Sequence, residues 1–173
     1  MRGSLPGVPA MLQPVGHALL QAVEEAESIM KDFNGDCLWM RPAGMASVGF
    51  HLRHLSGVLD RLFTYARAEP LSLQQLAYLE QERTPHMDSP GILLENFRLQ
   101  VDKALTQLRE TPDADLLAPR GIGRKQIPTN VLGLLFHAAE HTQRHLGQLL
   151  VTVRWVIEGN NHRPDINNIT RQP

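Results

Sequence analysis

The sequence predicts an all-α fold, a four-helix bundle with a long connection between its second and third helices. No alternation of apolar and polar residues typical of a half-buried strand extends over any length, and no internal repeat is present. The 173 residues suit one domain, expected to span 1–173 with irregular tails at 1–10 and 159–173. Apolar residues recur at helical spacing in four long stretches, near 11–33, 45–67, 89–109 and 128–156.

Turn and capping residues mark the ends of these stretches. Asn34-Gly35 ends the first helix, and Thr111-Pro112 closes the third. Ser47 can cap the second helix, because its hydroxyl can accept a bond from a free backbone N–H. The connection over 69–90 contains a short helix near 72–83. A connection of this length permits a crossover, so the helices on either side of it need not be antiparallel neighbours.

Composition argues against several classes of function. The formal net charge is −1 and the sequence pI is about 6.7, with Lys and Arg scattered along the chain. We therefore expect no nucleic-acid partner and no anionic-membrane surface. Cys37 is the single cysteine, which excludes an intramolecular disulfide and a Cys-based zinc site and fits a reducing cytoplasm. The first nine residues contain no signal-peptide core, and no segment has the length of a membrane span.

Three histidines recur every four residues in the last predicted helix: His137, His141 and His145. A four-residue step advances about 40° beyond a full helical turn, so the imidazoles form a ladder on one side of the helix. On a helical wheel His145 falls inside the apolar arc, His141 at its edge and His137 further out. Two imidazoles four residues apart can bind one divalent ion, although the spacing alone is common.

A second histidine pair, His51 and His54, lies in the second predicted helix, so that five of the eight histidines fall in two helices. Together the two clusters favour a metal site over histidines that merely hydrogen bond at a polar seam. His51 lies nearer the centre of the apolar arc and His54 on its flank. Periodicity therefore leaves the choice between His51 and His54 open.

The segment 113–129 is expected to be a loop, with the sequence Arg120-Gly-Ile-Gly-Arg-Lys125 at its centre. Its glycines do not follow a predicted strand or match a phosphate-loop spacing, which argues against a nucleotide site. A tight turn is the simplest interpretation. In the functional interpretation, Arg120, Arg124 or Lys125 attracts an anionic substrate group near the mouth of the bundle.

Two motifs resemble those of the DinB/YfiT-like superfamily: His54-Leu55, and His141-x-x-x-His145-x-Gly147-Gln148. The resemblance implies a four-helix bundle that binds a divalent metal through three histidines, one on the second helix and an HxxxH pair on the fourth. Carried over residue by residue, the ligand positions are His54, His141 and His145. His51 and His137 are additional, and the sequence does not show whether they take part.

The resemblance also implies a class of chemistry. Characterised relatives include thiol S-transferases that use bacillithiol or glutathione and mycothiol-dependent isomerases. Three imidazoles leave positions on the ion open, as in catalytic sites, and suit zinc, nickel or iron. We therefore expect a metal-dependent thiol S-transferase-like protein that acts on a small molecule with a small thiol cofactor. A metal-dependent hydrolase and a non-catalytic binding or sensing bundle remain the alternatives.

Other expectations drawn from the resemblance concern assembly and the substrate. A homodimer is implied. The Arg that usually follows the last ligand in the family is replaced by Leu146, which puts any substrate contact made by that Arg in doubt. The residues that carry catalysis, or that bind the thiol, are not identified by the sequence.

Overall fold

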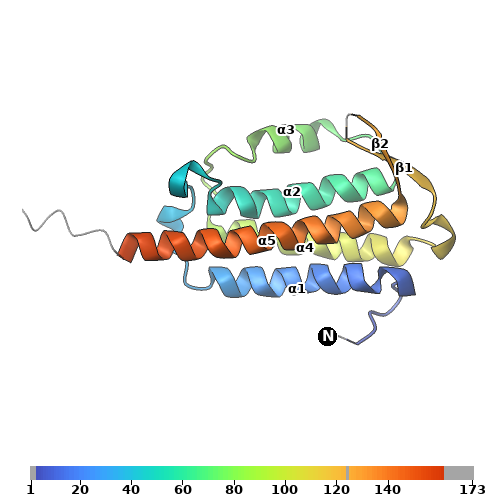
Figure 1. The fold of residues 1–173 in the computed structure, drawn as a ribbon, viewed down its shortest axis with the longest axis horizontal. Coiled ribbons are helices and arrows are strands. Elements are labelled where there is room, and N and C mark those ends of the chain that lie inside the picture. Colours follow the sequence, from blue (N-terminus) through green and yellow to red (C-terminus); the bar gives the residue numbers. More distant parts are fainter. Residues whose placement is uncertain (1–2, 124, 162–173) are drawn as a thin grey trace, which may run out of the picture.

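The computed structural model describes residues 3–123 and 125–161. It is mostly helical, with one two-stranded sheet (Figure 1). The α-helices are α1 (Gln13–Met30), α2 (Val48–Ala66), α3 (Leu73–Gln81), α4 (Pro90–Glu110) and α5 (Val131–Asn161). Short 3₁₀ helices, η1 to η4, span Ala10–Leu12, Gly35–Cys37, Pro42–Gly44 and Asp113–Asp115.

The four long helices pack lengthwise around a shared core. Helix α5 contacts α1 and α2, and α4 contacts the same two helices on their other side. Figure 1 shows these helices running along a common long axis. Their inward residues exclude water almost completely; the largest of them include Leu19, Leu52, Leu55, Leu59, Leu93, Phe97, Leu108, Leu135 and Leu149. Full burial of each such side chain contributes about 1.5–3 kcal/mol.

Serine caps begin three of the α-helices. The Ser47 hydroxyl accepts a hydrogen bond from the Phe50 backbone N–H at 3.1 Å, which confirms the predicted cap of α2. Ser89 caps α4 in the same way. Ser72 and Gln75 form a reciprocal capping box at the start of α3, so this short helix begins at a defined residue.

The connection between α2 and α4 carries α3 back over α2. Helix α3 contacts α2 rather than joining the core of the four long helices, and no residue of α3 is fully buried. Figure 1 shows α3 running along the outer side of α2. This placement brings the end of α3 to the histidine-bearing half of α2.

Two expectations about irregular segments were wrong. The predicted loop over 113–129 contains most of a hairpin, formed by β1 (Pro119–Ile122) and β2 (Ile127–Asn130), which pair antiparallel with Arg120 opposite Thr129. Each strand has four residues, too few for an alternating pattern to stand out. Its turn uses positive φ at Gly123 and Gln126, while Arg124 lies outside the described residues.

The tails also differ from the prediction. Helix α5 continues to Asn161, so 159–161 is helical, and the rest of the predicted C-terminal tail lies outside the described residues. At the other end η1 already begins at Ala10. Within the ranges that the structure describes, no helix combines the length and the apolar character needed to cross a bilayer.

Candidate metal centre

Three imidazoles converge between α2 and α5. His54, His141 and His145 each offer one ring nitrogen, and these atoms lie within 4.8 Å of one another. The Nε2 atoms of His54 and His141 are 3.0 Å apart, and the ring centroids of His54 and His145 are 4.2 Å apart. The group therefore joins two helices whose histidines are almost ninety residues apart in the sequence.

The donor set fits a divalent ion. Two nitrogens bound to one tetrahedral zinc at about 2.0–2.1 Å stand about 3.3 Å apart, close to the observed Nε2 separation. His141 Nδ1 is buried and makes no hydrogen bond to a described residue. Because Nε2 is the nitrogen that faces His54, an ion bound there would leave this second nitrogen without a partner among the described residues. Without an ion, the 3.0 Å contact is satisfied as a hydrogen bond between one protonated and one unprotonated nitrogen.

The environment favours the neutral imidazoles that metal binding requires. Burial, and after it the charge of a protonated His54, lower the pKa of His141 to about 4 and that of His145 to about 3. At neutral pH these two rings therefore carry an available lone pair. For His51, too, burial and then the charge of His54 lower the pKa to about 4.

A buried carboxylate orients His54. Glu82, the C-cap residue of α3, lies 2.7 Å from His54 Nδ1 through its Oε2 atom and accepts a hydrogen bond from Arg61 Nη1 at 2.7 Å through Oε1. The Glu82 side chain is 3% exposed. A carboxylate on Nδ1 fixes the ring so that Nε2 points toward His141, the arrangement typical of metal-bound histidines.

A glycine on α2 makes room for this carboxylate. A Cβ built on Gly57 would meet Tyr78 Cε1 at 2.7 Å and Arg61 Nη1 at 2.8 Å, and would collide with Glu82 Oε1. Gly57 therefore allows the end of α3 to approach α2 closely. Tyr78 fixes this approach further by donating a hydrogen bond from its hydroxyl to the Arg53 carbonyl at 3.1 Å.

The other two histidines of the clusters lie beside the group rather than in it. His51 is 4% exposed, and its Nδ1 lies 3.4 Å from His145 Nδ1, behind that ring. His137 is 41% exposed in its side chain and faces Glu140 Oε2 at 3.4 Å. His51 thus adjoins the group from the core side, and His137 lies one helical turn away near the surface.

An open cleft of about 830 Å³ lies in front of the imidazoles. Phe50 stacks on the His54 ring, with centroids 5.2 Å apart and an interplanar angle of 17°. The lining mixes apolar side chains, histidines and polar groups from α2, α5 and the segments before α2 and after α3: Met45, Ala46, Phe50, His51, His54, Arg83, His141, Arg144, His145, Gly147, Gln148, Val151 and Thr152. A small molecule can therefore reach the imidazoles from solvent.

The basic loop does not belong to this cleft. The Arg120 side chain donates from Nε to the carbonyl of Ala66 at 2.7 Å, at the opposite end of α2. Twelve residues of helix separate Ala66 from His54, roughly 18 Å. Arg120 therefore ties the hairpin to the end of α2, and Lys125 follows it in the same hairpin turn. Neither Arg120 nor Lys125 lines the histidine cleft, so the attraction of an anionic substrate group by this loop stays a prediction.

Sequence reasoning missed the residues that support the histidines. Glu82 is separated from His54 by 28 residues, and neither it nor Arg61 forms a motif with a histidine. A carboxylate at the end of the short predicted helix was the available signal, but only the path of α3 over α2 gives it meaning. Leu146 is 2% exposed and packs in the core, so the position after the last histidine does not face the cleft.

Comparison with known proteins agrees with this geometry. No match was found among curated proteins. The family model of the DinB superfamily matches residues 17–149, a span that contains both histidine clusters and most of the chain. The resemblance carried by the short histidine motifs is thereby confirmed, and the chain belongs to the DinB superfamily.

Proposed function

We propose that this protein is a divalent-metal-dependent enzyme of the thiol S-transferase type, with His54, His141 and His145 as the metal ligands. The observation that carries the proposal is the convergence of these three nitrogens, within 4.8 Å, at the floor of an open cleft. Three protein ligands leave a coordination position for a small molecule, as in catalytic rather than structural sites. Zinc, nickel and iron all suit imidazole ligands.

A bound ion would lower the pKa of a coordinated small thiol, so that the thiolate form predominates at neutral pH and can attack an electrophile. The chain's own residues prepare the site for this chemistry. Glu82 holds the His54 ring in one orientation, because its carboxylate is itself fixed by Arg61. Phe50 and Val151 supply apolar walls that limit water beside the histidines.

The thiol is expected to come from outside the chain. Cys37 is buried in η2 and does not line the cleft. Thr152 and Gln148 do line it; the Thr152 hydroxyl donates to the Gln148 backbone carbonyl at 2.8 Å, and the Gln148 side chain is exposed and can contact a ligand. A small thiol therefore has both apolar and polar surface to contact.

We also propose that the chain forms one domain of the four-helix-bundle type and associates as a homodimer. Two features support these proposals: the shared core of the four long helices, and the exposed apolar side chains Phe136 and Trp155 on α5. Light scattering on the eluting protein would test the second, with one chain mass at all concentrations as the contradicting result.

The first test is metal content, measured by mass spectrometry after loading with zinc or nickel and desalting. We expect about one ion per chain in the wild type and almost none in His54→Ala or His145→Ala. His137→Ala is the matched control on α5 and should keep its ion, because that ring lies outside the group. Equal retention in all three variants would contradict the ligand assignment.

The second test is turnover by metal-loaded protein with a small thiol and 1-chloro-2,4-dinitrobenzene. Conjugation that requires the ion and disappears in His54→Ala would support thiol transfer. Ester cleavage without a thiol would favour a metal-dependent hydrolase. Absence of both activities in protein that holds its ion would favour a binding or sensing role.

A further inference from the structure

The charges around the cleft have one sign. Among its thirteen lining residues are two arginines, Arg83 and Arg144, and no aspartate or glutamate. The two arginines come from different segments: Arg83 follows α3, and Arg144 lies on α5 between the last two histidines of the ladder. In a chain whose net charge is close to zero, this lining is locally electropositive.

Arg83 is held at the cleft by an aromatic ring. Its guanidinium carbon lies 4.8 Å from the centroid of Phe50, and Phe50 in turn stacks on His54. In the part of the chain that the structure describes, no carboxylate forms an ion pair with Arg83. Its N–H donors are therefore available to a ligand bound beside His54. Glu82, which orients His54, is the residue before Arg83. The same short segment therefore supplies both the carboxylate behind His54 and the Arg83 cation at the cleft.

Arg144 approaches the cleft from the α5 side. Its Nη2 is paired with Glu140, one helical turn earlier, and Glu140 does not line the cleft. A guanidinium has five N–H donors, so the contact with Glu140 restrains the side chain without using all of them. Arg83 and Arg144 thus border a cleft whose floor is the histidine group.

We infer that the thiol bound in this cleft carries an anionic group, such as a carboxylate, which Arg83 and Arg144 bind while the sulfur lies at the three histidines. Guanidinium groups match the geometry of carboxylates and form charge-assisted hydrogen bonds with them. This inference rests on the proposed function, because it assumes that a thiol reaches the metal position. It adds a selection by charge that the histidines do not provide.

Three thiols of similar size and different charge test the inference: 3-mercaptopropionate, 2-mercaptoethanol and cysteamine. Cobalt(II)-loaded protein is titrated with each, and the absorption of the cobalt–thiolate pair gives the Kd. We expect 3-mercaptopropionate to bind about tenfold more tightly than 2-mercaptoethanol, and cysteamine to bind most weakly. The preference should decrease at high salt, because both guanidinium groups are exposed.

The metal ion itself attracts anions, so arginine variants are needed to distinguish its contribution to the affinity from that of Arg83 and Arg144. Arg83→Ala and Arg144→Ala should each reduce the preference for 3-mercaptopropionate about threefold, and the double variant should remove it. Arg154→Ala is the matched control, an exposed arginine on α5 that does not line the cleft. It should leave all three Kd values unchanged.

The outcomes distinguish the inference from the function on which it rests. Equal affinities for the three thiols, or a preference that persists in the double variant, would overturn the inference and leave the metal site and thiol binding intact. A cobalt spectrum that no thiol alters would overturn thiol binding, and the inference with it. Loss of the cobalt spectrum in His54→Ala confirms that each titration reports on the histidine group.

Discussion

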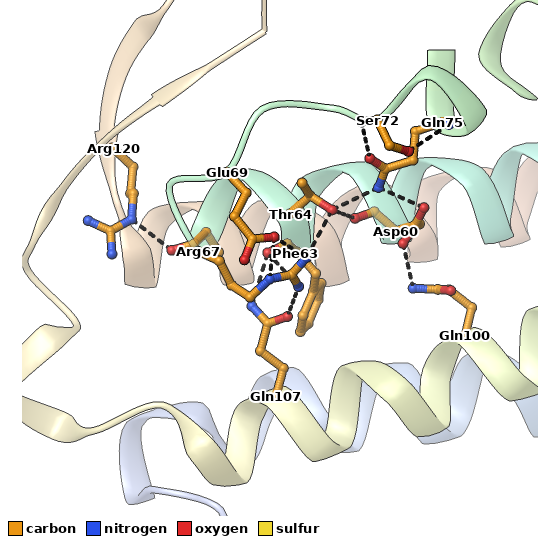
Figure 2. A network of polar contacts seen from close by, with 11 residues as sticks. Asp60, Phe63, Thr64, Arg67, Glu69, Ser72, Gln75, Gln100, Gln107 and Arg120 are labelled. Carbon is orange, nitrogen blue, oxygen red and sulfur yellow. Dashed lines mark hydrogen bonds and ion pairs between the residues drawn. The ribbon is translucent and has the colours of Figure 1, made fainter. Parts of the chain in front are cut away.

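The two halves of α2 use polar side chains in opposite ways. In the N-terminal half of the helix, which begins at Val48, His54 faces two other imidazoles and an open cleft. In the half that ends at Ala66, polar groups bond to one another (Figure 2). Gln75 on α3 donates from Nε2 to both Asp60 Oδ2 and Thr64 Oγ1 at 2.8 Å. This second half therefore fastens neighbouring elements to α2.

The same kind of bonding continues to the end of the helix. Figure 2 shows Arg67 directed toward Gln107 of α4, and the Gln107 amide donates to the Phe63 carbonyl at 3.0 Å. Arg120 closes the series by donating to the carbonyl of Ala66. Here each polar group meets a complementary one from the protein.

The contrast shows where to look for chemistry in a helical protein. Complementary donors and acceptors satisfy one another and leave nothing for a ligand, whereas like groups gathered together need an outside partner. In the N-terminal half of α2, the ring nitrogen of His54 faces the ring nitrogens of other histidines, and the carboxylate of Glu82 lies behind His54. The predictions below break or sharpen this contrast, beginning with the largest expected effect.

Replacement of Glu82 should do most damage, because it removes the carboxylate behind His54. In Glu82→Ala the Arg61 charge stays buried without its partner, which should lower the free energy of unfolding by about 3–5 kcal/mol. Metal affinity should fall about 10–100-fold as the His54 ring loses its orientation. Urea denaturation and metal titration measure the two effects.

A conservative variant and a surface control complete the Glu82 experiment. Glu82→Gln keeps the side-chain shape and should fold, yet bind the ion less tightly than the wild type. Glu95→Ala removes a carboxylate whose pair with Arg98 is exposed, and it should alter neither measurement appreciably. Unchanged metal affinity in both Glu82 variants would contradict a positioning role for this carboxylate.

Gly57→Ala should act on the same carboxylate indirectly. The added Cβ would collide with the side chains of Glu82, Tyr78 and Arg61, so α3 must shift. We expect a loss of about 1–3 kcal/mol in unfolding free energy and a weaker affinity for the ion. Gly147→Ala is the matched control, because its Cβ meets nothing within 4 Å and should stabilise α5 by about 0.5–1 kcal/mol. The same change in unfolding free energy in the two variants would argue against a close approach of α3 to α2 at Gly57.

Asp60→Ala should separate stability from metal binding. The substitution removes the carboxylate that accepts hydrogen bonds from the side-chain amides of Gln75 and Gln100, in the C-terminal half of α2. It should lower the free energy of unfolding by about 1 kcal/mol. The metal content should stay at that of the wild type, since Asp60 does not line the histidine cleft. A loss of the ion in this variant would show that the two halves are coupled.

A fall in pH should also destabilise the metal-free protein. An unfolded chain protonates its histidines near pH 6.5, whereas the folded chain keeps His51 and His141 neutral to about pH 4 and His145 to about pH 3. The unfolded state therefore binds more protons in this range, so stability is greatest above pH 6.5 and falls as pH decreases toward 4. Urea midpoints at pH 7.5, 6 and 5 measure the fall, which should be shallower in His145→Gln.

Much of the fold was predictable because helices are encoded locally. Apolar spacing located all four long helices and the short one, and Ser47 marked the start of α2. Boundaries shifted by a few residues. The hairpin at β1 and β2 escaped prediction, because four-residue strands contain too few side chains to show alternation.

The sequence alone also predicted the histidine ladder and the family motifs. A separation of four residues along a helix fixes the relative direction of two side chains, so the ladder follows from the spacing. Only the tertiary structure decided which other side chains lie against these histidines. Helix packing puts His54 into the group and His51 behind His145, and the path of α3 delivers Glu82 and Arg83 to the same place. A helical wheel shows the direction in which a side chain leaves one helix. A site also depends on which other helix packs against that side, and on the path of the connecting segments.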